Sequence, residues 1–242
     1  MDSPLHAFCN VCALDLLTLA RLHDRELDPE TVSALKDADF PLGMGLRLTG
    51  ADGRAMAEAL AEATGGLTLE PPADDELAAD FAAIYLTHAI GASPLESVWL
   101  DEDGLAMQAP MFEVRAAYAR FGLCAPDWRL RPDDHLVFQL QFVSALLDRG
   151  DEEAAAAAAE FLDTHLLRWL SSFAGRVAMR AATPFYAFLA GYTTAYLEEL
   201  RDLLAQISGV PRPEPEATAG QAETREEDVA QAAYVPGVAP SW

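Results

Sequence analysis

Basic residues are scarce in this sequence. Lysine and arginine together number 16, against 39 aspartates and glutamates, and the formal net charge at pH 7 is −23. A nucleic-acid backbone or an anionic membrane surface needs a positive patch on the protein that binds it. The shortage of positive charge therefore argues against both as partners, and it favours ligands that carry positive charge.

Cysteine and long apolar runs are also in short supply. The chain has three cysteines in 242 residues, and this odd number fits a reducing compartment better than a disulfide framework. No apolar run approaches the roughly 20 residues that span a bilayer. The first residues lack the basic start and the apolar block of a secretion signal. We therefore expect a cytoplasmic protein without stable membrane insertion.

Alternation of apolar and polar residues, the mark of strands, is missing as well, and helical periodicity takes its place. Asp28 and Pro29 predict a helix cap and a first helical residue, and prolines at positions 110, 132 and 184 open further helices. A longer helix is expected from Asp74, with Tyr85 and His88 on one of its faces. The sequence thus predicts an all-α fold.

The composition changes after residue 208. Residues 1–208 have the pattern of a single globular helical domain. Prolines then alternate with other residues at positions 211, 213 and 215, and an acidic cluster follows at 223–228. Such a composition is typical of a disordered segment, so we predict a flexible acidic tail over residues 209–242.

Two clusters of reactive residue types have a structural interpretation. Cys9 and Cys12 have the spacing of a metal or redox pair, but both belong to an apolar helical stripe and no second pair accompanies them. Asp134 and His135, joined by His88, are the candidates for a helical metal-dependent hydrolase. The alternative is that acids at the start of a helix opened by Pro132 stabilise its N-terminus. We expect no metal and no catalytic residue, and the hydrolase stays as the second hypothesis.

The expected loop from residue 91 to residue 110 is unusually long for a compact helical domain, and loops of this length tend to be functional. Trp99 lies in this loop, and Asp101 opens the acidic run Asp101-Glu-Asp103 directly behind it. The loop therefore predicts an aromatic wall with an acidic rim.

Five motifs follow one another in order along the chain: Tyr85-Leu-Thr-His88, Gly91-Ala-Ser-Pro94, Ser97-Val-Trp-Leu-Asp101, Val114-Arg115 and Pro132-Asp-Asp-His135. This series resembles the TorD/DmsD/NarJ family of chaperones for molybdenum enzymes, and the likeness extends over about residues 5 to 200. The resemblance implies a TorD-like helical bundle that is not an enzyme and that needs no cofactor.

The resemblance also implies a partner. A chaperone of this family would bind the twin-arginine signal peptide of a molybdopterin enzyme of the dimethyl sulfoxide reductase family. It would assist folding, cofactor insertion and proofreading of the catalytic subunit before export, as a monomer or a homodimer. An apolar helix in a groove, with acidic groups pairing to its arginines, is a familiar recognition mode. A non-catalytic acidic adaptor protein is a further alternative.

The expected signal-peptide site combines apolar and charged residues from the five motifs. Tyr85, His88, Trp99 and Leu100 are expected to line the groove, and Asp101, Asp134 and His135 to lie at its charged end. Arg115 belongs to the same set and is expected to orient an acidic partner nearby.

Overall fold

The computed structural model describes residues 3–71 and 73–213, and over these residues the protein is all-α, as predicted. The elements, in chain order, are α1 (Pro4–Asp24), α2 (Pro29–Asp37), α3 (Ala51–Gly65), α4 (Ala73–Phe81), η1 (Ala82–Leu86), α5 (Glu96–Leu100), α6 (Ala109–Arg120), α7 (Leu136–Leu147), α8 (Glu152–Phe161), η2 (Leu162–Leu166), α9 (Leu167–Arg180) and α10 (Pro184–Ser208). In the described part, extended pairing is limited to an isolated bridge between Leu95 and His135.

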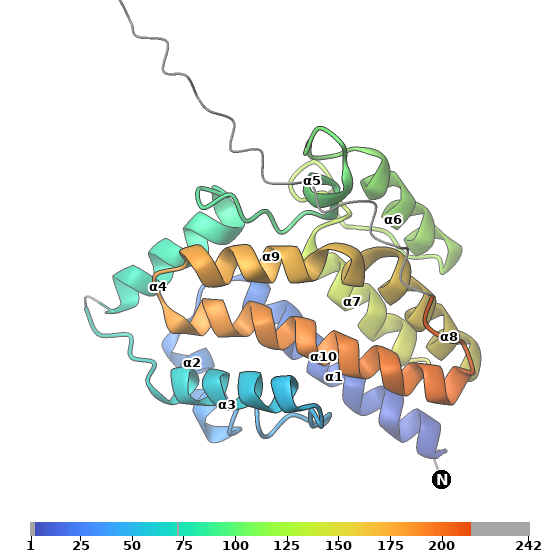
Figure 1. Ribbon diagram of the computed structural model, residues 1–242, viewed down its shortest axis with the longest axis horizontal. Helices are drawn as coiled ribbons and strands as arrows, with labels where there is room; N and C mark the ends of the chain where they lie inside the picture. Colours follow the sequence, from blue (N-terminus) through green and yellow to red (C-terminus); the bar gives the residue numbers. More distant parts are fainter. Residues whose placement is uncertain (1–2, 72, 214–242) are drawn as a thin grey trace, which may run out of the picture. The chain divides into compact units, whose positions relative to one another are not determined.

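Helix α10 is the central element of the domain (Figure 1). It packs against α9, α3 and α8, while α1 packs along α7. Large aromatic side chains on α10 and α9 are completely or almost completely buried, among them Trp169, Tyr186, Tyr192 and Tyr196. Because large aromatic side chains bury much apolar surface, they contribute much of the stability of such a core.

Helix α1 is the one described helix whose length and composition would suffice to cross a membrane. The expectation that no apolar stretch approaches this length was therefore wrong. Cys9, Cys12, Leu16 and Leu19 on this helix have no exposed surface and belong to the hydrophobic core. The interpretation of both cysteines as core residues is confirmed.

The chain departs from the prediction after Phe81. The α-helix ends there and continues as η1, a wider turn closed by a bond of 2.8 Å from the Thr87 amide to the Ala82 carbonyl. His88 follows with φ of +53°, outside the helix. The prediction that Tyr85 and His88 share one helical face was wrong, because the wide turn breaks the 3.6-residue period.

A second departure concerns the start of α7. The helix begins at Leu136, and the side chain of His135 caps it by accepting a 3.2 Å bond from the Val137 amide. The predictions that Pro132 opens this helix and that the two preceding aspartates stabilise its N-terminus were wrong. Both carboxylates are instead held by groups from distant parts of the chain, as described below.

The predicted helix cap at Asp28 is confirmed. Asp28 caps α2 by accepting a bond from the Thr31 amide, and Asp151 caps α8 in the same way from the Ala154 amide. Residues 210–212 still lie against α10, where Arg201 donates to the carbonyls of residues 210 and 211. The rest of the predicted flexible tail, residues 214–242, lies outside the described residues, and the boundary after residue 208 stays a prediction.

Candidate functional site

The long loop and the segment before α7 are joined by hydrogen bonds. The Leu136 amide donates to the Pro94 carbonyl over 2.8 Å, and the Glu96 amide donates to the Asp134 carbonyl over 3.2 Å. The Asp134 carboxylate also accepts a 2.8 Å bond from the Ser97 amide. We call residues 94–97 and 133–136 the α5 junction. It brings three of the five sequence motifs together, those that contain Pro94, Ser97 and Asp134, and it fixes helix α5, which the sequence did not predict inside the loop.

Two acidic side chains are completely buried at the α5 junction. Glu96 lies 2.9 Å from the Nδ1 atom of His165 and accepts a 2.9 Å bond from Gln139. Asp134 keeps one carboxylate oxygen, Oδ1, without a partner among the described residues. Burial raises the pKa of both carboxyl groups, because the charged form loses its hydration. The expected position of Asp134 at an open, charged end of a groove was therefore wrong.

Arg115 holds the neighbouring acid of the same junction. Its guanidinium forms a 2.8 Å ion pair with Asp133, and Tyr118 donates a 3.0 Å bond to the Asp133 carbonyl. The same guanidinium lies 5.3 Å from the ring centre of Phe112 and 4.9 Å from that of Trp128. The acidic group nearest to Arg115 is thus Asp133 of the same chain, and the expected part of Arg115 in a leader site stays a prediction.

Trp99, Leu100 and Asp101 lie half-buried at the end of α5. The indole of Trp99 donates a 2.7 Å bond to the Ser93 carbonyl, and Arg176 on α9 lies 5.5 Å from the centre of the indole ring. The Asp101 carboxylate accepts bonds from the amides of residues 103 and 105. These contacts fix Trp99 and Asp101, while part of each of the three side chains stays accessible to a ligand.

Tyr85 and His135 occupy buried positions instead. The Tyr85 hydroxyl lies 2.6 Å from Nδ1 of His23, whose Nε2 lies 2.9 Å from the Thr193 hydroxyl. Burial lowers the pKa of His23 to about 3 and holds the pKa of His135 well below its ordinary value. The expectation that Tyr85 and His135 line an open site was therefore wrong, whereas His88 is half-buried.

The ligand set of the hydrolase hypothesis does not form. In residues 3–71 and 73–213, no group of three or more His, Cys, Asp or Glu side chains is arranged to hold a metal ion. Asp134 is engaged with the Ser97 amide, and the Nδ1 atom of His135 with the Val137 amide. Asp134 and His135 thus serve to fix the α5 junction.

Sequence reasoning missed a run of exposed apolar side chains beside α5 and α6. Large hydrophobic residues with more than a third of their surface exposed recur here: Leu105, Met107, Phe112, Leu123, Trp128 and Leu130. We call these residues, together with Trp99, Leu100 and the acids at 101–103, the α5–α6 surface. Phe112 could have been recognised from the sequence, since Met111 and Val114 form the buried stripe of α6 and leave Phe112 outside it.

This chain is similar in sequence to one protein family and to several proteins that are named as chaperones. The family model described as nitrate reductase delta subunit matches residues 49–175. The chaperone protein TorD of Vibrio parahaemolyticus is 28% identical over 184 residues, which cover 72% of this chain and 83% of that protein. TorD of Vibrio vulnificus strain YJ016 is 33% identical over 142 residues, or 55% of this chain and 66% of its own length. The chaperone protein YcdY of Escherichia coli is 28% identical over 133 residues, or 55% and 67%.

The family match covers more than half of the chain, and these relatives are named as chaperones. They confirm the expectation of a chaperone that is not an enzyme. The matched region contains α3 to α8 and the whole α5 junction with its buried acids. The chain belongs to the nitrate reductase delta subunit family, the TorD/DmsD/NarJ family of chaperones.

Proposed function

We propose that this protein is a cytoplasmic chaperone that assists the maturation of a molybdopterin enzyme of the dimethyl sulfoxide reductase family. It binds the twin-arginine leader of the catalytic subunit and keeps that subunit from export until the cofactor is inserted. Membership of the chaperone family supports this proposal, and so does the chemistry of the α5–α6 surface.

The α5–α6 surface has the two properties that a leader peptide needs. A large exposed apolar patch on a protein surface often marks a site where the protein binds a partner. Its exposed rings, Phe112 and Trp128, offer area to the apolar segment of a leader, and Asp101 begins an acidic run for the two arginines. Each exposed arginine–carboxylate pair contributes roughly 1 kcal/mol or less and is screened by salt. The apolar contacts must therefore supply most of the affinity.

The buried members of the expected site act indirectly. Asp134 holds the Ser97 amide at the start of α5, and Arg115 holds Asp133 beside Phe112 and Trp128. These residues fix the α5–α6 surface and do not touch the leader. We therefore assign leader contact to the half-buried and exposed residues of that surface.

Titration of the purified protein with a synthetic leader tests this assignment. The peptide carries two adjacent arginines followed by an apolar, helix-prone segment. We expect Trp99→Ala and Phe112→Ala each to weaken binding about tenfold or more, which corresponds to about 1.4 kcal/mol or more. The matched control is Ile207→Ala, which removes an exposed apolar side chain from the far end of α10. A second control replaces the two arginines of the peptide with lysines.

Two results would contradict the assignment. One is unchanged affinity in both variants at the α5–α6 surface while circular dichroism shows them folded. The other is equal weakening in Ile207→Ala, which would mean that apolar area anywhere on the protein serves equally well.

A further inference from the structure

Helix α9 is a basic element in a strongly acidic protein. It contains three arginines and no aspartate or glutamate, while the whole chain has a formal net charge of −23. An α-helix has 3.6 residues per turn, so residues four and eight apart lie on the same side of it. Arg168, Arg176 and Arg180 have this spacing. They form a row of positive charge, which we call the α9 arginine row.

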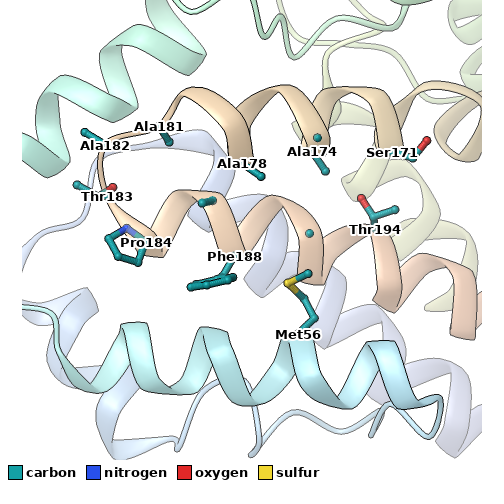
Figure 2. A pocket seen from close by; sticks show the side chains of 13 residues that line it. Met56, Ser171, Ala174, Ala178, Ala181, Ala182, Thr183, Pro184, Phe188 and Thr194 are labelled. Carbon is teal, nitrogen blue, oxygen red and sulfur yellow. The ribbon is translucent and has the colours of Figure 1, made fainter.

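The α9 arginine row is separate from the two other faces of the helix. The first of these packs Trp169 and Phe173 into the core. The second carries small uncharged side chains such as Ala178, and it lines a space of about 590 Å³ beside α10 (Figure 2). In the row itself, Arg168 and Arg180 are exposed. The row is therefore open to a partner.

The three guanidinium groups have no carboxylate partner. None of them forms an ion pair with any residue in the ranges 3–71 and 73–213. Arg176 and Arg180 each use one terminal nitrogen to bond a loop carbonyl, that of Gly91 over 3.2 Å and that of Ile90 over 2.7 Å. Because a guanidinium has five N–H donors, most donors of the row are left for a ligand.

Two of the charges are held close together at Gly91. A Cβ atom added to this glycine would lie 3.2 Å from Nη1 of Arg180 and 3.4 Å from Nη1 of Arg176. Like charges four residues apart on a helix destabilise it. A carboxylate bound beside Gly91 would remove this repulsion and accept charge-assisted hydrogen bonds from both guanidinium groups. The geometry therefore favours an anionic ligand.

The extent of the row favours a polypeptide over a small anion. At 1.5 Å per residue, the row extends over about 18 Å from Arg168 to Arg180, so a small anion would contact only one end of it. Met179 lies on the same side of the helix and is 75% exposed, and methionine is an adaptable apolar side chain that is common at protein-binding surfaces. A helix with a few acids and an apolar residue on one face matches this arrangement.

We propose that the α9 arginine row binds an acidic helix of a partner polypeptide, with carboxylates over Arg168, Arg176 and Arg180 and an apolar side chain against Met179. A ligand that is negative along its whole length is disfavoured, because the acidic remainder of the protein repels it. The acidic helix is opposite in charge to the twin-arginine leader. The proposal holds whether or not the α5–α6 surface binds that leader.

Fluorescence titration at low salt with an acidic helical peptide tests the proposal. The probe is an alanine-based peptide of about 18 residues, with three glutamates at the spacing of the arginines and a leucine between them. In the control peptide lysines replace the glutamates. We expect Arg168→Gln and Arg180→Gln each to weaken binding of the acidic probe about threefold to fivefold and to reduce its dependence on salt. Arg168→Gln is the cleaner variant, because this side chain makes only one long bond, 3.4 Å to the Thr164 carbonyl.

Two further variants separate charge from apolar contact. The matched control, Arg47→Gln, removes the same charge from an exposed position outside α9 and should leave binding unchanged. Met179→Ala should weaken binding about threefold without changing its dependence on salt, because it removes apolar area and no charge.

Three outcomes overturn the proposal. The first is equal binding of the acidic probe and the lysine peptide by the wild type, or no binding of either. The second is equal weakening by Arg47→Gln and by Arg168→Gln, which would mean that any positive charge on the protein serves equally well. The third is tighter binding of a single-stranded oligonucleotide than of the acidic probe, with the same dependence on Arg168, which would assign the row to a nucleic acid. Leader binding by Arg168→Gln should equal that of the wild type, so either proposal can fail alone.

Discussion

At the scale of single residues, several polar side chains that the sequence placed in a binding site are buried instead. They form hydrogen bonds to backbone groups. Asp134 is completely buried. One of its carboxylate oxygens accepts a hydrogen bond from the Ser97 amide, and the other has no hydrogen-bond partner in the described part of the chain. A buried acceptor that is removed leaves its donor unsatisfied, at a cost of about 1–3 kcal/mol. A neutral oxygen at the same position could still accept this bond, so the acceptor and the charge can be tested separately.

Replacement of Asp134 by asparagine or alanine separates these two properties. Asp134→Asn keeps an acceptor for the Ser97 amide, so we expect it to cost less than about 1 kcal/mol at pH 7, whereas Asp134→Ala should cost about 1–3 kcal/mol. Urea unfolding measures both. Burial raises the pKa of Asp134 in the folded state, so the folded protein takes up a proton at this group at a higher pH than the unfolded chain does. As the pH falls toward 3.8, this group should therefore add to the free energy of unfolding of the wild type, and the asparagine variant should lack that increase. Equal losses in the two variants at pH 7 would contradict the assigned role.

At the scale of elements, local signals could be read from the sequence and distant contacts could not. Asp28 caps α2 as predicted, and Asp151 caps α8 in the same way, because the bonded amide lies three residues away in each case. Asp133 and Asp134 also precede a helix, but their carboxylates bond to groups far away in the sequence. Asp133 pairs with Arg115, 18 residues away, and Asp134 accepts a bond from the Ser97 amide, 37 residues away. No local pattern distinguishes the two situations. The same competition explains why α5 and the capping role of His135 were missed.

The turn between α7 and α8 gives a prediction at this scale. Gly150 has φ of +66°, and a Cβ atom added there would come within 1.9 Å of Nδ1 in the His6 ring on α1. Gly150→Ala should therefore suffer both backbone strain of about 1 kcal/mol and a steric clash. We expect a total loss of roughly 2–4 kcal/mol in urea unfolding, within the range of large single-site effects.

Gly122 provides the matched control for Gly150. Its φ is +71°, but an added Cβ atom meets nothing within 4 Å. Gly122→Ala should show the strain alone, and the double variant His6→Ala/Gly150→Ala should recover most of the difference. If Gly122→Ala and Gly150→Ala lose the same stability, the contact between α1 and the α7–α8 turn contributes nothing.

At the scale of the whole molecule, the fold class followed from helical periodicity, and the positions of the site residues did not. The sequence correctly assigned Cys9 and Cys12 to the core, because a stripe of apolar residues on one helix is a local property. Whether Tyr85 or Trp99 faces solvent depends on which elements cover them. Tyr85 is covered by His23 of α1 and by Tyr186 of α10, whereas Trp99 is only partly covered by α9. Exposure is thus decided by tertiary contacts between elements far apart in the chain.

Histidines buried in a neutral state give the whole domain a sensitivity to acid. In the folded protein burial lowers the pKa of His23 to about 3, whereas the unfolded chain keeps a value near 6.5. The unfolded state therefore binds a proton that the folded state rejects, and stability is lost as pH falls from 6.5 toward 3. At pH 5 the loss from this one group is about 2 kcal/mol. His135, whose pKa is also held well below its ordinary value, acts in the same direction.

The contribution of His23 can be isolated by comparing wild type with His23→Gln in urea unfolding at pH 7 and pH 5. A glutamine can bond the hydroxyls of Tyr85 and Thr193 but does not titrate, so the variant should be somewhat less stable at pH 7. Between the two pH values, however, wild type should lose about 2 kcal/mol more than the variant, because only wild type must exclude a proton from this position. Acids whose pKa burial raises, such as Glu96, titrate in both proteins and cancel in the comparison. Parallel losses in the two proteins would mean that His23 is protonated, or reached by water, in the folded state, and that α1, η1 and α10 are not closed around it.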